Sequence, residues 1–412
     1  MLKISYFFIA LFCFLFPSLT NAANSGTKFS LSKNSELTIQ VSSNVAAAFR
    51  NQSSDFEQAK LDNETNNRQD QNLALENNSQ LYLKLENKNP QNSDQIKFGT
   101  IIKIESELSS AQNKGTINAD QGFVYANSES FGKIEFGDNI AVNQKMKVGP
   151  ASFARGAGGI NGNYLKYINL PINSQFILIA QSPIGHGGSA LSGSQINQNS
   201  IKILRDKSFN GAEDATKINY YSPRIAGFQL GASYTPNSSN SLVSSTVFNG
   251  KNNSFLDVIS VGANYTNSFD NFDYAFSATS EQAKSKAATQ NNLSAYDIAT
   301  TMAYFGFTFG ASYGSWKKSL QNADQTFKNS TYKTLGISYQ IGHFSVSLTN
   351  LNTNFEKNAY HATSLGLDYK LSKVFIPYLE ITQFRFKSNQ SQIQNIADNK
   401  GFVALTGFLI SF

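Results

Sequence analysis

Single charged side chains that alternate with apolar ones are the residues of this chain best placed to do chemistry. Lys84, for example, lies between Leu83 and Leu85. In an extended chain successive side chains point to opposite faces, so the apolar residues share one face and the charges share the other. Charges gathered on one face set a local potential that attracts or repels small ions. The candidates of this kind are Arg50, Lys84, Lys103, Glu105, Lys133 and Glu135, and the segment that follows adds Asp138, Lys145, Lys147 and Arg155.

The three histidines, His186, His343 and His361, do not indicate a catalytic or metal site. They are dispersed, and none has a cysteine or carboxylate at ligand spacing. Two positions after His361 the chain has Thr363 rather than a serine nucleophile. The sequence also has no phosphate-binding loop or dinucleotide fingerprint. We therefore predict no cofactor, no metal and no enzymatic activity.

The charge balance of the 412 residues is mildly basic, with 34 Lys and Arg against 28 Asp and Glu. The basic residues are scattered rather than clustered, so we predict no nucleic-acid partner. Beyond the N-terminal segment, no stretch approaches the run of about 20 apolar residues that a membrane helix needs.

The N-terminal segment is typical of a secretory signal peptide. Lys3 precedes a short apolar stretch, Ile4–Phe16, and Thr20-Asn-Ala22 supplies a small-x-small cleavage site. We predict a signal peptide over residues 1–22 and a mature domain over 23–412, with an uncleaved anchor helix as the alternative. The only cysteine, Cys13, lies inside the signal, so the mature chain would contain no disulfide.

The elements that position the charges are strands almost throughout. In Phe305–Tyr313, aromatic and apolar residues alternate with Gly, Thr and Ser, and a period of two indicates a strand. We predict sixteen strands from Ser35–Arg50 to Lys400–Phe412, among them Ser79–Asn87 and Gln121–Asn127.

The connections between these strands alternate between long and short. This asymmetry is typical of an outer-membrane barrel, which has short periplasmic turns and long extracellular loops. In lipid such a barrel must close, because an open edge would leave backbone groups unpaired in hydrocarbon. We therefore predict an all-β fold, a transmembrane antiparallel β-barrel. Aromatic residues near the strand ends fit the two membrane interfaces, namely Tyr220, Tyr304, Tyr339 and Tyr369 on the turn side and Tyr234, Tyr313 and Trp316 on the loop side.

Three motifs resemble those of the Gram-negative general porins. They are Gly122-Phe-Val-Tyr-Ala with Ser130-Phe-Gly-Lys-Ile-Glu-Phe-Gly137, the hairpin Lys217-Ile-Asn-Tyr-Tyr-Ser-Pro-Arg-Ile-Ala-Gly-Phe228, and the terminal Phe412. The resemblance implies a homotrimer of 16-stranded barrels among outer-membrane lipids. It also implies that Phe412 is the signal read by the outer-membrane assembly machinery, and that a third loop, about residues 138–215, folds into the lumen as a constriction.

The long third loop departs from the family pattern. It contains two apolar runs, Phe176–Ala180 and Ile201–Leu204, which could form an extra hairpin and give eighteen strands. The acidic motif that many porins have on this loop is not evident.

The resemblance implies a water-filled channel for passive diffusion of small hydrophilic solutes and ions. Among the candidate charges, seven are basic and three acidic, which predicts a weak anion preference. The alternatives are a substrate-specific channel and a surface-exposed adhesin or antigen.

Overall fold

The computed structural model describes residues 26–57, 72–87, 96–109, 114–171, 174–184, 191–192, 215–238, 255–324, 327–389 and 398–412. The predicted signal peptide, His186 and the apolar run Ile201–Leu204 lie outside these residues.

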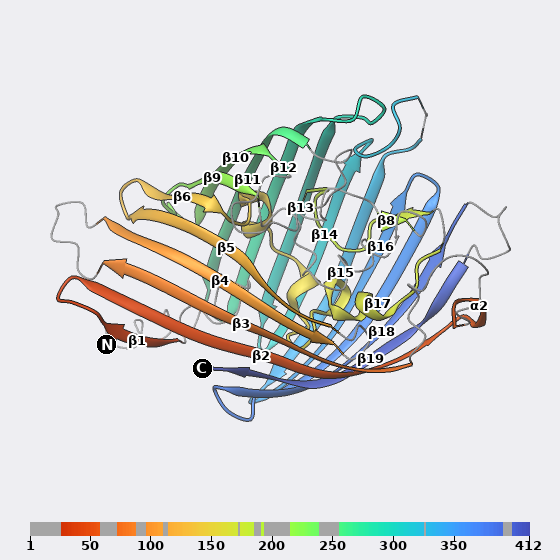
Figure 1. Cartoon of the computed structure of the whole chain (residues 1–412), viewed down its shortest axis with the longest axis horizontal. Helices are drawn as coiled ribbons and strands as arrows, with labels where there is room; N and C mark the ends of the chain where they lie inside the picture. Colours follow the sequence, from red (N-terminus) through yellow and green to blue (C-terminus); the bar gives the residue numbers. More distant parts are fainter. Residues whose placement is uncertain are drawn as a thin grey trace.

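The wall of the molecule is a closed ring of antiparallel strands (Figure 1). Each wall strand pairs with the next, and the last pairs with the first through Gly401–Gln52 to Ser411–Ser42. The predicted sixteen-stranded barrel is thereby confirmed. Its strands are β2 (Ser35–Gln52), β3 (Leu73–Asn87), β4 (Lys97–Ser109), β5 (Lys114–Ser128), β6 (Gly132–Asp138), β9 (Thr216–Tyr221), β10 (Phe228–Asn237), β11 (Phe255–Phe269), β12 (Phe272–Ser285), β13 (Leu293–Tyr304), β14 (Phe307–Lys317), β15 (Ser330–Ile341), β16 (Phe344–Phe355), β17 (Asn358–Tyr369), β18 (Phe375–Lys387) and β19 (Asp398–Ser411).

One edge of β2 pairs with both β1 and β19. The short strand β1 (Thr27–Ser30) pairs with residues Glu36 to Ile39 of β2. On the same edge β19 pairs from Ser42 onward, and the backbone of Phe412 exchanges two hydrogen bonds with Val41. The exposed edge that β2 would otherwise present is thus covered along most of its length.

The two faces of the wall differ as the alternation predicts. On β14, Phe307 and Phe309 are exposed, while Ser312 is buried. The outward face of the ring is apolar and the inward face is largely polar, which is the arrangement of a barrel surrounded by lipid. No helix in the described part of the chain is long and apolar enough to cross a membrane.

Short turns join the strands at one end of the barrel, here called the turn end, and longer connections lie at the other, the loop end. At the turn between β13 and β14, Phe305 and Gly306 both have positive φ. Two such residues form the turn type that matches the twist of a two-stranded hairpin.

The remaining elements are short and belong to the connections. They are α2 (Ser54–Glu57), α3 (Val142–Lys145), the 3-10 helices η2 (Pro150–Ser152), η3 (Gly159–Asn161) and η4 (Asn163–Tyr167), and the two-residue strands β7 (Gln175–Phe176) and β8 (Leu191–Ser192). The strands β7 and β8 pair only with each other. The apolar run that begins at Phe176 is therefore not part of the wall.

Trp316 is not where the sequence placed it. We expected this residue at the membrane interface, but its side chain is fully buried and donates its ring N–H to the carbonyl of Gln181 at 2.7 Å. Trp316 lies on the same face of β14 as Ser312 and Gly314, so the alternation itself points the indole inward, where its ring packs against that of Phe355.

Candidate functional site

Residues 139–171 and 174–184, which follow β6 in the chain, run along the inward face of the wall (Figure 1). We call these residues the inner segment. Its helix α3 contacts β9 to β12, η2 contacts β14 and β15, η3 contacts β16 to β18, and η4 contacts β2 and β19. These contacts reach strands around much of the ring.

One part of the inner segment packs through apolar side chains. Phe176 to Ala180 are almost fully buried, and the ring of Phe176 meets that of Phe386 edge-on with 4.9 Å between centroids. Inward-facing aromatic residues of the wall supply the other side of this core, namely Trp316, Phe355, Tyr360, Phe384 and Phe386. Each such side chain contributes about 1.5–3 kcal/mol by leaving water. The hydroxyl of Tyr164 shares a hydrogen bond with that of Tyr360, and burial raises the pKa of Tyr164.

A buried carboxylate fixes the turn of the inner segment around η3. Glu380 on β18 accepts hydrogen bonds from the backbone N–H groups of Ala157 and Gly159, the second at 2.9 Å. Two backbone groups of the segment are therefore held by one wall residue.

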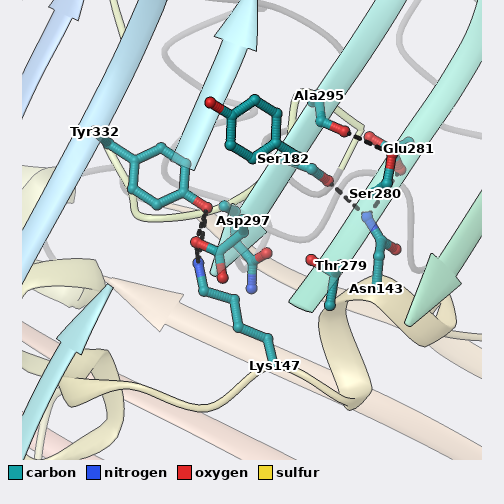
Figure 2. A pocket seen from close by; sticks show the side chains of 11 residues that line it. Asn143, Lys147, Ser182, Thr279, Ser280, Glu281, Ala295, Asp297 and Tyr332 are labelled. Carbon is teal, nitrogen blue, oxygen red and sulfur yellow. Dashed lines mark hydrogen bonds and ion pairs between the residues drawn. The ribbon is translucent and has the colours of Figure 1, made fainter. Parts of the chain in front are cut away.

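A buried lysine provides a second anchor (Figure 2). The Lys147 amine lies 3.2 Å from an Asp297 oxygen, and it donates to the Tyr332 hydroxyl at 2.8 Å and to the Ala180 carbonyl at 2.6 Å. Burial lowers the pKa of Lys147, and Asp297 opposes this effect. The same small cavity contains Glu281, which accepts a hydrogen bond from the Asn143 amide at 3.2 Å.

The candidate charges on β3 to β6 form three neighbouring sets of ion pairs. Lys84 pairs with Glu86 at 2.8 Å, and Lys103 pairs with Glu105 at 3.0 Å and with Asp120 at 2.8 Å.

On β6, Glu135 pairs with Lys133 at 2.7 Å and with Lys145 of the inner segment at 2.8 Å. Lys133 also lies 5.0 Å from the centre of the Tyr125 ring. We call this group, Lys84, Glu86, Lys103, Glu105, Asp120, Lys133, Glu135 and Lys145, the charged wall.

The other candidates lie apart from the charged wall. Arg50 is buried and donates to the Tyr167 carbonyl at 3.0 Å. Asp138 is buried and accepts a hydrogen bond from the Thr216 hydroxyl. Arg155 pairs with Asp368 on β17 at 3.3 Å. Together with Lys147 on Asp297, these residues anchor the inner segment or its ends, so the ten candidates do not form a single ring.

Our sequence reasoning missed most of the inward-facing acids. Glu380 lies between Leu379 and Ile381, the same pattern that singled out Lys84, so alternation could have found it. The buried acids that were not among the candidates are Glu76, Asp120, Glu281, Asp297, Asp368 and Glu380. Within the described residues, no three His, Cys, Asp or Glu side chains are grouped as a metal site requires.

A closed antiparallel barrel of sixteen strands, apolar outside and polar inside, is the architecture of a bacterial outer-membrane channel protein. Comparison with known proteins agrees. The Gram-negative porin family model matches residues 10–389, and the chain belongs to this family.

Two solved structures share the fold. An anion-selective porin from Comamonas acidovorans superposes with a TM-score of 0.55 at 14% identity, covering 92% of this chain and 100% of that one. A triple mutant of the Rhodopseudomonas blastica porin gives a TM-score of 0.50 at 11% identity, covering 91% of this chain and 100% of that one.

Proteins of similar sequence occur in Rickettsia. An uncharacterized protein of Rickettsia bellii is 27% identical over 333 residues, which is 69% of this chain and 74% of that protein. An uncharacterized protein of Rickettsia typhi is 26% identical over 383 residues, which is 77% of this chain and 81% of that protein.

Proposed function

We propose that this chain forms a water-filled channel through the outer membrane for passive diffusion of small hydrophilic solutes and ions. The observation that carries the proposal is the solvent exposure of charged side chains on the inward face of the closed ring. Lys84 and Lys133 are 23% and 34% exposed, and Arg155 of the inner segment is 29% exposed. Charged side chains that reach water inside a closed barrel are what an aqueous lumen requires.

The channel as proposed is asymmetric. The inner segment fills the side of the lumen along β14 to β19 with apolar side chains, and the charged wall on β3 to β6 faces it. The bore would therefore follow the charged wall, with the inner segment as its constriction.

Conductance across planar bilayers tests the proposal directly. The purified protein is expected to give stepwise conductance increases in KCl and to make liposomes permeable to small sugars. Inserted, folded protein that conducts no ions and passes no sugars would contradict it.

A weak anion preference is part of the proposal, on a different basis from the count of seven basic and three acidic candidates. The buried acids remove that excess. However, the two partners of each inward-facing ion pair differ in exposure. In the pairs of the described residues the basic side chain is the more exposed, as in Lys133 (34%) beside Glu135 (2%), and Lys103–Glu105 is the exception. Exposed charges contribute more to the electrostatic potential along the path of an ion than buried, paired charges do. The solved porin of Comamonas acidovorans is described as anion-selective.

We also propose a homotrimer that contacts its neighbours through β2 to β4. Small polar side chains lie in register on the outward face of these strands, with Ser43 opposite Ser79 and Ser79 opposite Ser106. Small residues allow close approach of two membrane proteins, and polar groups in mid-membrane favour protein partners over lipid. Unheated gel electrophoresis is expected to show a trimer, and migration only as a monomer in mild detergent would contradict it.

Export would use the signal peptide of residues 1–22. Protein recovered from the outer membrane is then expected to begin at Ala23, which N-terminal sequencing can establish.

A further inference from the structure

A row of basic and amide side chains crosses the outward face of the barrel near the loop end. Lys333 is directly opposite Asn352, Asn352 opposite His361, His361 opposite Arg385, and Arg385 opposite Lys400. The row therefore runs unbroken over the five strands β15 to β19. Lys387 lies two residues beyond Arg385 on the same face. We call these six residues, Lys333, Asn352, His361, Arg385, Lys387 and Lys400, the outer row.

The basic side chains of the outer row are exposed and carry little compensating charge. Lys333, Arg385, Lys387 and Lys400 are all exposed, and none of them forms an ion pair within the described part of the chain. Among the residues that the structure describes, the one acid beside them on this face is Asp398, opposite Lys387. Like charges directly opposite one another destabilise a sheet, so the placement of Arg385 against Lys400 calls for an anion from outside.

The outer row lies at the level expected for lipid headgroups. Tyr313, opposite Lys333, continues the row onto β14, and tyrosines of this kind mark the membrane interface. Toward the turn end the same face becomes apolar at Leu348, Leu365 and Ile381, which are exposed. Between the two levels lie Asn350, Thr363 and Gln383, and the Asn350 amide donates to the Thr363 hydroxyl at 2.8 Å.

The distribution of charge along the outer row indicates the shape of the anion. Lys333 stands at one end, and Arg385, Lys387 and Lys400 stand at the other. Three strand spacings separate Lys333 from Arg385, or about 14 Å. Between them lie Asn352 and His361, which are hydrogen-bonded to each other. Two cationic ends and a neutral polar centre fit a sugar headgroup with a phosphate at each end.

We propose that the outer row binds a bisphosphorylated glycolipid of the outer leaflet. Its two phosphates would contact Lys333 at one end and Arg385 with Lys400 at the other. Its sugar hydroxyls would face Asn352 and His361, and its acyl chains would lie on Leu348, Leu365 and Ile381. The site rests on the proposed outer-membrane location of the barrel, but not on its conducting ions.

Binding of lipid A to the purified full-length protein tests the site. Delipidated protein in mild detergent is titrated with bisphosphorylated lipid A, and bound lipid is counted by native mass spectrometry. A basic residue near an anionic membrane surface is worth about 1 kcal/mol, or roughly fivefold in affinity. The triple variant K333Q/R385Q/K400Q is therefore expected to bind on the order of 100-fold more weakly.

A matched control removes the same charge elsewhere. K284Q/K286Q/K318Q changes three exposed lysines at the loop end that are not in the outer row, and it is expected to bind like the wild type. Dephosphorylated lipid A should bind the wild type as weakly as lipid A binds the outer-row variant. Inorganic phosphate at the same concentration should not displace lipid A, because it lacks the acyl chains.

Three results would overturn the proposal. The first is a lipid A affinity of the outer-row variant within threefold of wild type, and the second is an equal loss of lipid A affinity in the control variant. The third is loss of the trimer in the outer-row variant with unchanged lipid A binding. The last result would make the outer row a contact between protein copies. Conductance measured on the same samples distinguishes failure of the lipid-binding proposal from failure of the channel proposal. The outer-row variant should conduct normally, while a wild-type protein that binds lipid A but does not conduct contradicts only the channel.

Discussion

The ion pairs of the charged wall set how each inward-facing charge acts on a passing ion. Lys103 lies between two carboxylates, Glu105 and Asp120, whereas Lys133 shares the buried Glu135 with Lys145. Neutralised pairs contribute little to the potential in the bore, so the exposed lysines dominate it.

The variants K103E and K133E should therefore shift selectivity toward cations. K103E places a third carboxylate beside Glu105 and Asp120. Exchanging a positive for a negative charge at 8 Å changes the energy of a passing ion by about 1 kcal/mol in water, or roughly fivefold in the permeability ratio. Reversal potentials across a KCl gradient measure this ratio. K284E, on the outward face, should leave it unchanged, and a wild-type pore that already favours potassium would contradict our assignment of the exposed charges.

Lys147 is expected to act through stability rather than through selectivity. Both it and Asp297 are less than a tenth exposed, and removing one partner of a buried ion pair costs about 3–5 kcal/mol. K147M should therefore lower the temperature at which the folded barrel converts to the unfolded band on gels, and K147M/D297N should recover part of the loss. K318M, on an exposed turn, serves as the control. Equal melting of K147M and wild type would show that the anchor is dispensable.

At the scale of elements, the inner segment depends on a few wall residues for its position. Glu380 holds two backbone N–H groups beside η3, and no side chain of the segment itself makes those bonds. Its removal would leave the two groups without their acceptor.

E380A should therefore make the channel current unsteady. The inner segment would gain alternative positions near β16 to β18, and single-channel records should show transitions between conductance levels several times more often than in wild type. Q383A changes the outward face of the same strand and should give a steady current. A steady current in E380A would mean that the apolar packing around Phe176 is sufficient to hold the segment.

The sequence was sufficient for the barrel but not for the lengths of all its strands. We predicted strands at Ser79–Asn87 and Gln121–Asn127, yet β3 begins at Leu73 and β5 at Lys114. On β3 the polar residues at 76–80 interrupt the outward apolar pattern. On β5 the bulge beside Asp120, between Lys103 and Ile104 of its partner strand, reverses the parity of the alternation. Such interruptions leave no periodic signal in the sequence.

The candidate site was predictable only where one face of a strand is apolar. Lys84, Lys103 and Lys133 followed from that pattern, and their partners on the same strands lie beside them. On β18, however, inward-facing Phe384 and Phe386 are as apolar as outward-facing Ile381. The reason is the contact with Phe176, more than 200 residues away in the chain, so beyond Glu380 alternation on β18 does not show which face meets lipid.

For the whole molecule, closure of the ring is the step that makes a membrane-spanning barrel. The final strand supplies it, and its last residue still contributes, since the Phe412 backbone exchanges hydrogen bonds with Val41 at 2.9 and 3.2 Å. The side chain of Phe412 is 62% exposed and is the part accessible to an assembly factor.

Deletion of Phe412, or F412D, should reduce the folded trimer in the outer membrane severalfold while export to the periplasm continues. F412Y keeps an aromatic end and should assemble normally. Fractionated membranes and unheated gels measure both. A normal trimer yield after the deletion would exclude Phe412 as an assembly signal.

The shared edge of β2 has a consequence for how the barrel finds its register. Because β1 pairs with Glu36 to Ile39 and Phe412 pairs with Val41, only Gln40 of β2 lies between the two pairings, and its amide donates to the Ser411 hydroxyl at 3.0 Å. A slip of β19 toward the turn end by even one residue would exchange its two faces and drive Phe412 toward Thr27. The hairpin of β1 and β2 thus limits how far β19 can slide along β2. The N-terminal strands thereby fix the register of the C-terminal strand.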